Sequence, residues 1–126
     1  IAESEVLVLG TPVYWYGPTA IMKAFIDRLV FFNDPRTRPL IRGHRAALVI
    51  PFEDTTLDTS ELLVQMLSKS LAYLEVQLAG KVVVPGVGER GEVLSKPESL
   101  TACEELGTLL ASSETADRRT REGIDA

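Results

Sequence analysis

Three short apolar segments constrain the fold more than any other feature of this 126-residue chain. Residues 5–10 (EVLVLG), 45–52 (RAALVIPF) and 76–85 (VQLAGKVVVP) are rich in Val, Leu and Ile, and Gly, Pro or polar turn residues follow each of them. Nearly continuous apolar runs of this length indicate strands that are buried on both faces, as a parallel sheet requires. The sequence therefore predicts a small parallel sheet.

Segments with helical spacing separate these strands. Apolar residues recur at a helical period over residues 19–32 and 58–73, and a further helix begins at Pro97. Asp58 and Glu61 have the spacing of a capping box at the start of the second helix. The order strand–helix, repeated three times, predicts parallel βαβ units with right-handed crossovers.

The chain is short enough to form one domain, which would bury roughly two thirds of its unfolded surface. We expect residues 1–112 to form this α/β domain. Residues 113–126 are charged and poor in apolar side chains, so we expect them to form a flexible C-terminal tail.

Composition argues against several classes of function. A net charge of −5 and an isoelectric point near 4.9 argue against nucleic acid or an anionic membrane as the main partner. No apolar run approaches the roughly 20 residues that cross a bilayer. The chain has a single Cys and so cannot form an internal disulfide, which suits a reducing compartment. We therefore expect a cytoplasmic protein. The single His44 leaves no second histidine for a zinc site, and we expect no bound metal.

An aromatic loop follows the first strand. The chain has four Phe, three Tyr and one Trp. Three of these eight aromatic residues, Tyr14, Trp15 and Tyr16, stand side by side within the stretch GTPVYWYG. In parallel α/β sheets the loops at the carboxyl ends of the strands carry ligands. The rings either cover the end of the sheet or a subunit interface, or form a platform on which a flat ring stacks. The pattern alone names no ligand.

The segment GTPVYWYGPTAIMKAFIDRL, residues 10–29, resembles the third-strand region of flavodoxin-fold NAD(P)H-dependent FMN reductases and related quinone reductases. That family has a Ser/Thr-Pro-Val-Tyr loop, then Gly, then a helix ending Lys-Ala-Phe-Ile-Asp-Arg. RGHRAALVI resembles the fourth strand, and VVVPGVGERGEV with KPESLTACEELG resembles the fifth strand and last helix. The resemblance spans roughly residues 5–112. It implies a flavodoxin-like three-layer α/β/α fold with a parallel sheet, of which this chain carries the strands corresponding to 3, 4 and 5.

The resemblance implies FMN as the cofactor and NAD(P)H as the co-substrate. One loop would lie against the isoalloxazine ring of FMN, with the residues Thr11, Pro12, Val13, Tyr14, Trp15, Tyr16 and Gly17. A second loop would flank the same ring, with the residues Phe52, Glu53, Asp54 and Thr55. The flavin performs the chemistry in such enzymes, so we nominate no catalytic side chain.

Two other patterns have simpler interpretations. Glu53, Asp54 and Asp58 could form a carboxylate site for a metal or for acid–base chemistry, but a solvated loop with a helix cap at Asp58 is the favoured interpretation. Residues 86–91 have the spacing G-x-G-x-x-G, but no helix opens directly after them, so they are interpreted as a loop.

The implied function is an FMN-dependent NAD(P)H oxidoreductase that passes electrons to a small-molecule acceptor such as a quinone or free flavin. The alternatives are a flavodoxin-like electron carrier and a truncated, non-catalytic interaction module. In the family a Ser/Thr-rich turn after the first strand holds the FMN phosphate, whereas this sequence begins at what resembles the third strand. We therefore expect a longer parent protein, or a second chain that covers the first strand. Relatives form dimers or tetramers, so we expect a homo-oligomer.

Overall fold

The computed structural model describes residues 1–122, and the side chains of residues 1–112. Three parallel strands form one sheet in the order β1-β2-β3, as the sequence predicts. Their bounds are Val6–Gly10 for β1, Arg45–Pro51 for β2 and Gln77–Val84 for β3. β2 is the central strand, because it pairs with β1 on one side and with β3 on the other.

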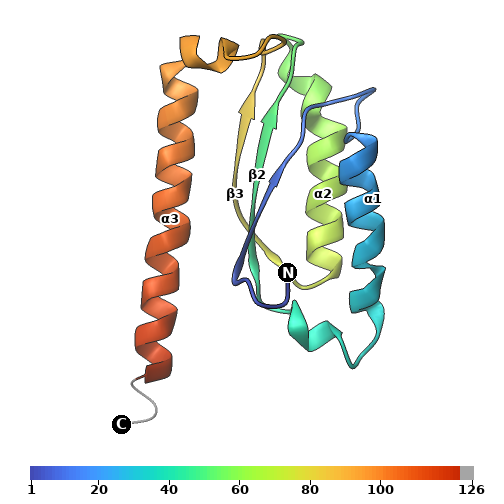
Figure 1. Cartoon of the computed structure of the whole chain (residues 1–126), viewed down its shortest axis with the longest axis vertical. Coiled ribbons are helices and arrows are strands. Elements are labelled where there is room, and N and C mark those ends of the chain that lie inside the picture. Colours follow the sequence, from blue (N-terminus) through green and yellow to red (C-terminus); the bar gives the residue numbers. More distant parts are fainter. Residues whose placement is uncertain (123–126) are drawn as a thin grey trace.

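Helices cover both faces of this sheet (Figure 1). α1 (Ala20–Arg28) and α2 (Glu61–Tyr73) lie side by side on one face, and α3 (Pro97–Glu122) lies on the other. Four short 3-10 helices join the elements: Leu29–Asn33, Arg38–Leu40, Leu57–Ser60 and Glu92–Ser95. The result is a three-layer α/β/α arrangement, in agreement with the predicted fold class.

The core lies between the sheet and the α1–α2 layer. Side chains of β2, among them Leu48 and Ile50, are fully buried, and so are Leu63, Leu67 and Leu71 of α2. These three leucines lie four residues apart, so they form one stripe along α2 that faces β2. The apolar periodicity of the sequence thus identified the core-facing side of this helix.

Two helix boundaries differ from the sequence prediction. α1 ends at Arg28, and the chain continues to Asn33 as a 3-10 helix, where the sequence predicted α-helix to residue 32. The predicted capping box of Asp58 and Glu61 is wrong. Residues Leu57–Ser60 form a 3-10 helix, α2 begins at Glu61, and no side chain caps it.

The C-terminal helix is longer than the sequence predicts. α3 continues to Glu122, beyond residue 112, at which the sequence analysis ended the domain and began a flexible tail. Residues 123–126 of that predicted tail lie outside the described residues. The division into a domain and a tail therefore stays a prediction. In the part of the chain that is described, no helix combines the length and apolarity needed to span a bilayer.

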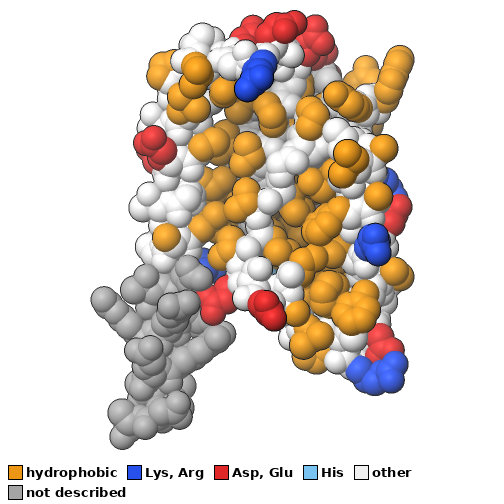
Figure 2. Space-filling model, in the orientation of Figure 1, with side chains coloured by type: hydrophobic (Ala, Val, Ile, Leu, Met, Phe, Trp, Pro, Cys, Tyr) orange, Lys and Arg blue, Asp and Glu red, His pale blue; other side chains and the backbone are white. Residues whose placement is uncertain are grey.

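β1 forms an open edge of the sheet. The Glu5 carbonyl accepts a hydrogen bond from Arg45 N–H (3.1 Å), and Thr11 N–H donates to the Val49 carbonyl (3.2 Å). Because backbone groups alternate along a strand, those of Val6, Val8 and Gly10 point away from β2. The Val8 side chain is 61% exposed. Figure 2 shows apolar side chains gathered on this face, between α3 and α1.

The stripe on α2 gives a test of the core. Replacement of the fully buried Leu67 by Ala should lower the free energy of unfolding by about 2–5 kcal/mol, because it leaves a cavity against β2. Leu62→Ala on the same helix is the matched control, since Leu62 is 60% exposed and should lose less than about 1 kcal/mol. Urea denaturation measures both values. Equal losses for the two variants would contradict the assigned face of α2.

Candidate functional site

The loops that leave the three strands meet at one edge of the sheet. Residues 11–19 follow β1, residues 52–56 follow β2, and residues 85–91 follow β3. This carboxyl edge lies at the top of Figure 1. Since β1 and β2 are hydrogen-bonded neighbours, the first two loops lie next to each other, as the sequence predicts. Ligands of parallel α/β sheets bind at this edge, so these loops form the candidate site.

The aromatic loop contains a tight turn. Tyr14 N–H donates to the Gly17 carbonyl (2.9 Å), and Gly17 N–H donates to the Tyr14 carbonyl (3.0 Å). The two central residues, Trp15 and Tyr16, have φ angles of 51° and 64°. Positive φ at both central positions is the pattern of a type I′ turn, which favours Asn and Gly. Bulky residues held there cost of order 1–3 kcal/mol each, so this turn is strained.

The rings of this turn point into solvent. Trp15 is 97% exposed, and Tyr14 and Tyr16 are each more than half exposed. These rings therefore do not cover the end of the sheet, which was one interpretation of the sequence. The strained turn therefore holds its aromatic rings in water, where they add nothing to the hydrophobic core of the described residues. Such a combination at a ligand-bearing edge indicates a binding surface.

The base of the loop is firmly held. Thr11 is buried, and its hydroxyl accepts a hydrogen bond from Thr19 N–H (3.3 Å) and donates one to the Pro12 carbonyl (3.0 Å). Thr19 in turn caps α1 by accepting from Met22 N–H (3.2 Å). Thr11 thus ties the end of β1 to the start of α1. Val13 packs against the core, so these residues position the aromatic turn and do not themselves form its surface.

The second predicted loop divides in the same way. Phe52 is buried, and its backbone is bonded on both sides to β3 and the loop after it, through Val84 and Val87. Glu53, Asp54 and Thr55 are exposed. Phe52 therefore anchors the loop, and the next three residues form its surface.

Asp54 organises this second loop. Its carboxylate accepts hydrogen bonds from Thr56 N–H (3.0 Å) and from the Thr59 hydroxyl (2.8 Å). The bond from the Thr56 backbone, and then that from Thr59, hold the pKa of the Asp54 carboxyl below its usual value. Asp54 therefore closes the turn between β2 and α2, and the helix cap that the sequence analysis assigned to Asp58 is absent. No group of three His, Cys, Asp or Glu side chains suited to a metal ion lies within the described residues.

Sequence reasoning did not include the loop after β3 in the site. Gly86 N–H donates to the Asp54 carbonyl (2.9 Å), so this loop borders residues 53–55. A Cβ atom at Gly88 would lie 3.0 Å from the Glu53 side chain. The Glu92 carboxylate accepts from the N–H groups of Glu89 (3.0 Å) and Gly88 (2.9 Å), which lowers the pKa of Glu92. The position of this loop directly after a parallel strand was the signal that could have identified it.

Comparisons with known proteins find similar sequences. A sequence model of the family described as NADPH-dependent FMN reductase matches residues 1–89. The FMN-dependent NADH:quinone oxidoreductase of Pelagibacter ubique is 32% identical over 68 residues, which make up 48% of this chain and 35% of that protein. The iron-sulfur flavoprotein of Archaeoglobus fulgidus is 27% identical over 115 residues, which make up 90% of this chain and 48% of that protein.

A solved structure is similar as well. The Trp repressor binding protein from Bacillus subtilis matches with a TM-score of 0.75 at 24% identity, over 83% of this chain and 64% of that one. This likeness shows the fold. The chain spans between about a third and a half of the length of the two curated relatives.

The hydrogen bonds of Asp54 predict a pH-dependent contribution to stability. A carboxyl whose pKa is lowered by folding stabilises the protein above its unfolded pKa of about 3.9, and this stabilisation is lost as the pH falls through the folded pKa. The melting temperature of Asp54→Asn should therefore lie below that of the wild type at pH 6, and the gap should shrink below about pH 4. Asp58→Asn is the matched control and should show no such gap. A gap independent of pH would contradict this role.

Proposed function

This chain belongs to the NADPH-dependent FMN reductase family. We propose that it is part of a flavin-dependent oxidoreductase, in which it holds the isoalloxazine ring of FMN. The family resemblance and the flavodoxin-like α/β fold that the sequence predicts are both confirmed. The names of the two curated relatives, an FMN-dependent oxidoreductase and a flavoprotein, support the same cofactor for this chain.

The aromatic turn is the observation that carries the proposal. Trp15 and its neighbours Tyr14 and Tyr16 expose their rings at the ligand edge, on a strained but doubly hydrogen-bonded turn. Stacking on a flat heteroaromatic ring would remove this apolar surface from water. The ring would gain a rigid platform, because the turn is fixed at both of its ends.

Backbone donors in the same loop suit the polar edge of a flavin. Among the described residues, no group accepts a hydrogen bond from the N–H of Val13, Trp15 or Tyr16. A flavin offers carbonyl and ring-nitrogen acceptors along one edge of its ring system. The loop can therefore provide both stacking faces and directed donors, a combination typical of cofactor sites.

The phosphate of FMN fits these loops less well. Thr56 and Thr59 stand between β2 and α2, where a Ser/Thr-rich turn could hold an anion. However, the Thr56 N–H and the Thr59 hydroxyl already donate to the Asp54 carboxylate. A phosphate at this place would meet that negative charge. The described loops therefore suit the ring of FMN, and we assign its phosphate to residues outside them.

The chemistry belongs to the cofactor, and the chain supplies its position. When bound, FMN would supply hydride transfer from NAD(P)H and electron transfer to an acceptor. The aromatic turn would orient the ring, and residues 53–55 would limit the access of water at its flank. We propose a small molecule as the acceptor and test a quinone first, since the Pelagibacter relative is named as a quinone oxidoreductase.

FMN binding tests this proposal. FMN fluorescence should be quenched on binding, and Tyr14→Ala or Trp15→Ala should weaken the affinity by more than about 1 kcal/mol, or about fivefold, if the rings stack on the flavin. Leu100→Ala on α3 is the control, because it removes apolar surface from the opposite layer. The proposal fails if no FMN binds, either to this chain alone or after fusion to the N-terminal strands of a family member.

The reaction is tested on the FMN-bound protein. Under anaerobic conditions NADH or NADPH should bleach the flavin absorbance, and a quinone should restore it. A protein that binds FMN but is not reduced by either nicotinamide would be an electron carrier and not a reductase. Full-strength binding by Tyr14→Ala and Trp15→Ala would instead place these rings at a protein interface.

A further inference from the structure

Lys96 brings a positive charge to the carboxyl edge of the sheet. It lies between the 3-10 helix Glu92–Ser95 and Pro97, the first residue of α3, at the top of Figure 1. Its backbone is fixed there, because its N–H donates to the Val93 carbonyl (3.0 Å) and its carbonyl accepts from the Ser99 N–H (3.0 Å). The side chain is half-buried. Lys96 is therefore held in place at the edge where the candidate site lies.

The Lys96 side chain reaches the loop that we propose at the flank of the flavin. Gly86, which follows β3, has a φ angle of 68°. A Cβ atom at this glycine would lie 3.4 Å from Lys96 Nζ and 3.7 Å from Thr55 Cγ2. The ammonium group and the Thr55 side chain thus border the same glycine. Since Thr55 belongs to residues 53–55, the charge of Lys96 lies beside that flank.

The stability of the chain does not explain this lysine. Its ammonium group forms neither a hydrogen bond nor an ion pair with any described residue. The position directly before a helix favours Ser, Thr, Asp or Asn, and the helix dipole disfavours a cation there. The pKa of Glu92 is lowered mainly by the hydrogen bonds from the Glu89 and Gly88 N–H groups, and the charge of Lys96 adds a smaller part. A charge that has no partner in the protein is available to a ligand.

The surface around Lys96 is acidic. Figure 2 shows Asp and Glu side chains gathered at this edge, and Glu53 and Asp54 are exposed in the loop beside the proposed ring position. Hydride transfer from NAD(P)H brings two electrons and one proton, so the ring gains one negative charge until a second proton binds. Two neighbouring carboxylates oppose this charge, and a nearby cation favours it. Lys96 is a cation that the structure places against the same loop.

We propose that Lys96 stabilises the negative charge that FMN gains on reduction, and that it thereby raises the potential at which the bound flavin is reduced. The inference rests on the proposed function and deepens it, since it assigns a positioning role in the electrostatics of the site to a residue outside both predicted loops. Salt screens a half-buried charge less than an exposed one, so the effect persists at physiological ionic strength. The oxidised ring is neutral, so its binding depends little on Lys96.

A redox titration of the FMN-bound protein tests this role. Lys96→Met should weaken the binding of reduced FMN about tenfold more than the binding of oxidised FMN, because one neighbouring opposite charge is lost. For a two-electron couple this ratio corresponds to a fall of about 30 mV in the midpoint potential. Anaerobic equilibration with a reference dye measures the potential at constant pH. Lys96→Arg keeps the charge and should keep a potential close to that of the wild type.

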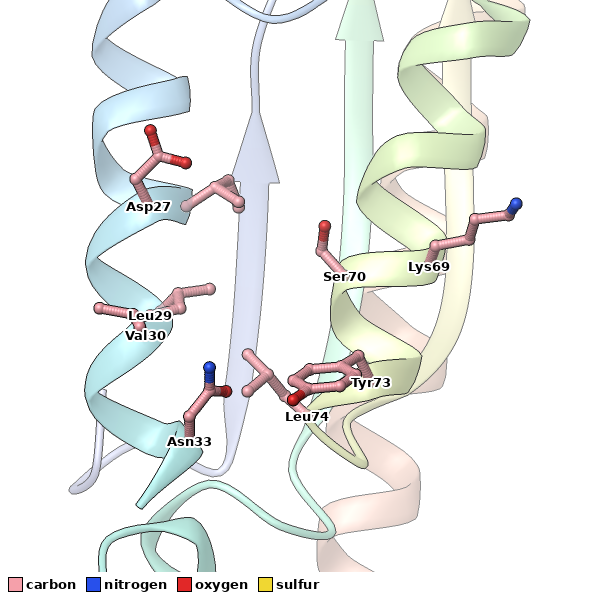
Figure 3. A pocket seen from close by; sticks show the side chains of 9 residues that line it. Asp27, Leu29, Val30, Asn33, Lys69, Ser70, Tyr73 and Leu74 are labelled. Carbon is pink, nitrogen blue, oxygen red and sulfur yellow. The ribbon is translucent and has the colours of Figure 1, made fainter.

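Two further variants separate the effect of Lys96 from a change in net charge. Lys69→Met removes one lysine from α2, beside the groove between α1 and α2 (Figure 3), and should leave the potential unchanged. Glu53→Gln removes a carboxylate from the loop that Lys96 borders, so it should shift the potential upward, opposite to Lys96→Met. Thermal melting checks that each variant is folded. Lys96→Gln, which keeps a polar side chain, should give the same downward shift as Lys96→Met.

The failure of this inference differs from the failure of the proposed function. The role of Lys96 is overturned if FMN binds but both neutral variants keep the wild-type potential, or if Lys69→Met shifts it as far. It is also overturned if Lys96→Met weakens oxidised and reduced FMN equally, since Lys96 would then act in binding alone. If no form of the protein binds FMN, the proposed function fails and the role of Lys96 fails with it.

Discussion

The parallel pairing of β2 with both of its neighbours is the constraint on which the rest of the molecule depends. It brings Gly10, Pro51 and Val84 to one edge, and the three loops of the candidate site begin there. The helical layers depend on the same strand. Leu48 and Ile50 fill the core, and the Arg45 guanidinium donates to the Leu110 carbonyl (3.0 Å), which ties the start of β2 to α3. α3 also packs closely on β3, where a Cβ atom at Gly80 would lie 2.6 Å from Leu106.

The sequence predicted the strands and helices well, because apolar periodicity directly reports burial in this chain. It failed at two helix ends, which apolar periodicity does not define. The first helix was predicted to reach residue 32, but the chain beyond Arg28 forms a 3-10 helix, and Arg38 donates hydrogen bonds to the Phe32 and Tyr73 carbonyls. The predicted cap at Asp58 had the correct spacing, but Asp54 takes the Thr59 hydroxyl instead. Neither contact has a signature in local composition.

The place of the candidate site was predictable, and its geometry was not. The order of strands and helices puts an aromatic loop at the carboxyl edge, and this is where the structure has it. Residue preference gives no hint that Trp15 and Tyr16 adopt positive φ, because bulky side chains disfavour that region. Thr11 and Phe52, which the family resemblance places at the ring, are buried and anchor their loops, and their contact with a ligand stays a prediction. The residues proposed to contact FMN still depend on the family resemblance and on the exposed rings.

The turn and the β1 edge share a physical property: each leaves apolar groups or backbone donors in water. Two residues in the left-handed region cost of order 1–3 kcal/mol each, a large share of the 5–15 kcal/mol by which domains are typically stable. The core between β2 and α2 must offset this strain in the free chain. A ligand or subunit that binds only the folded state adds stability by mass action. Binding at the turn and folding of the sheet are therefore coupled, because β1, which leads into the strained turn, also contributes Leu7 and Leu9 to the core.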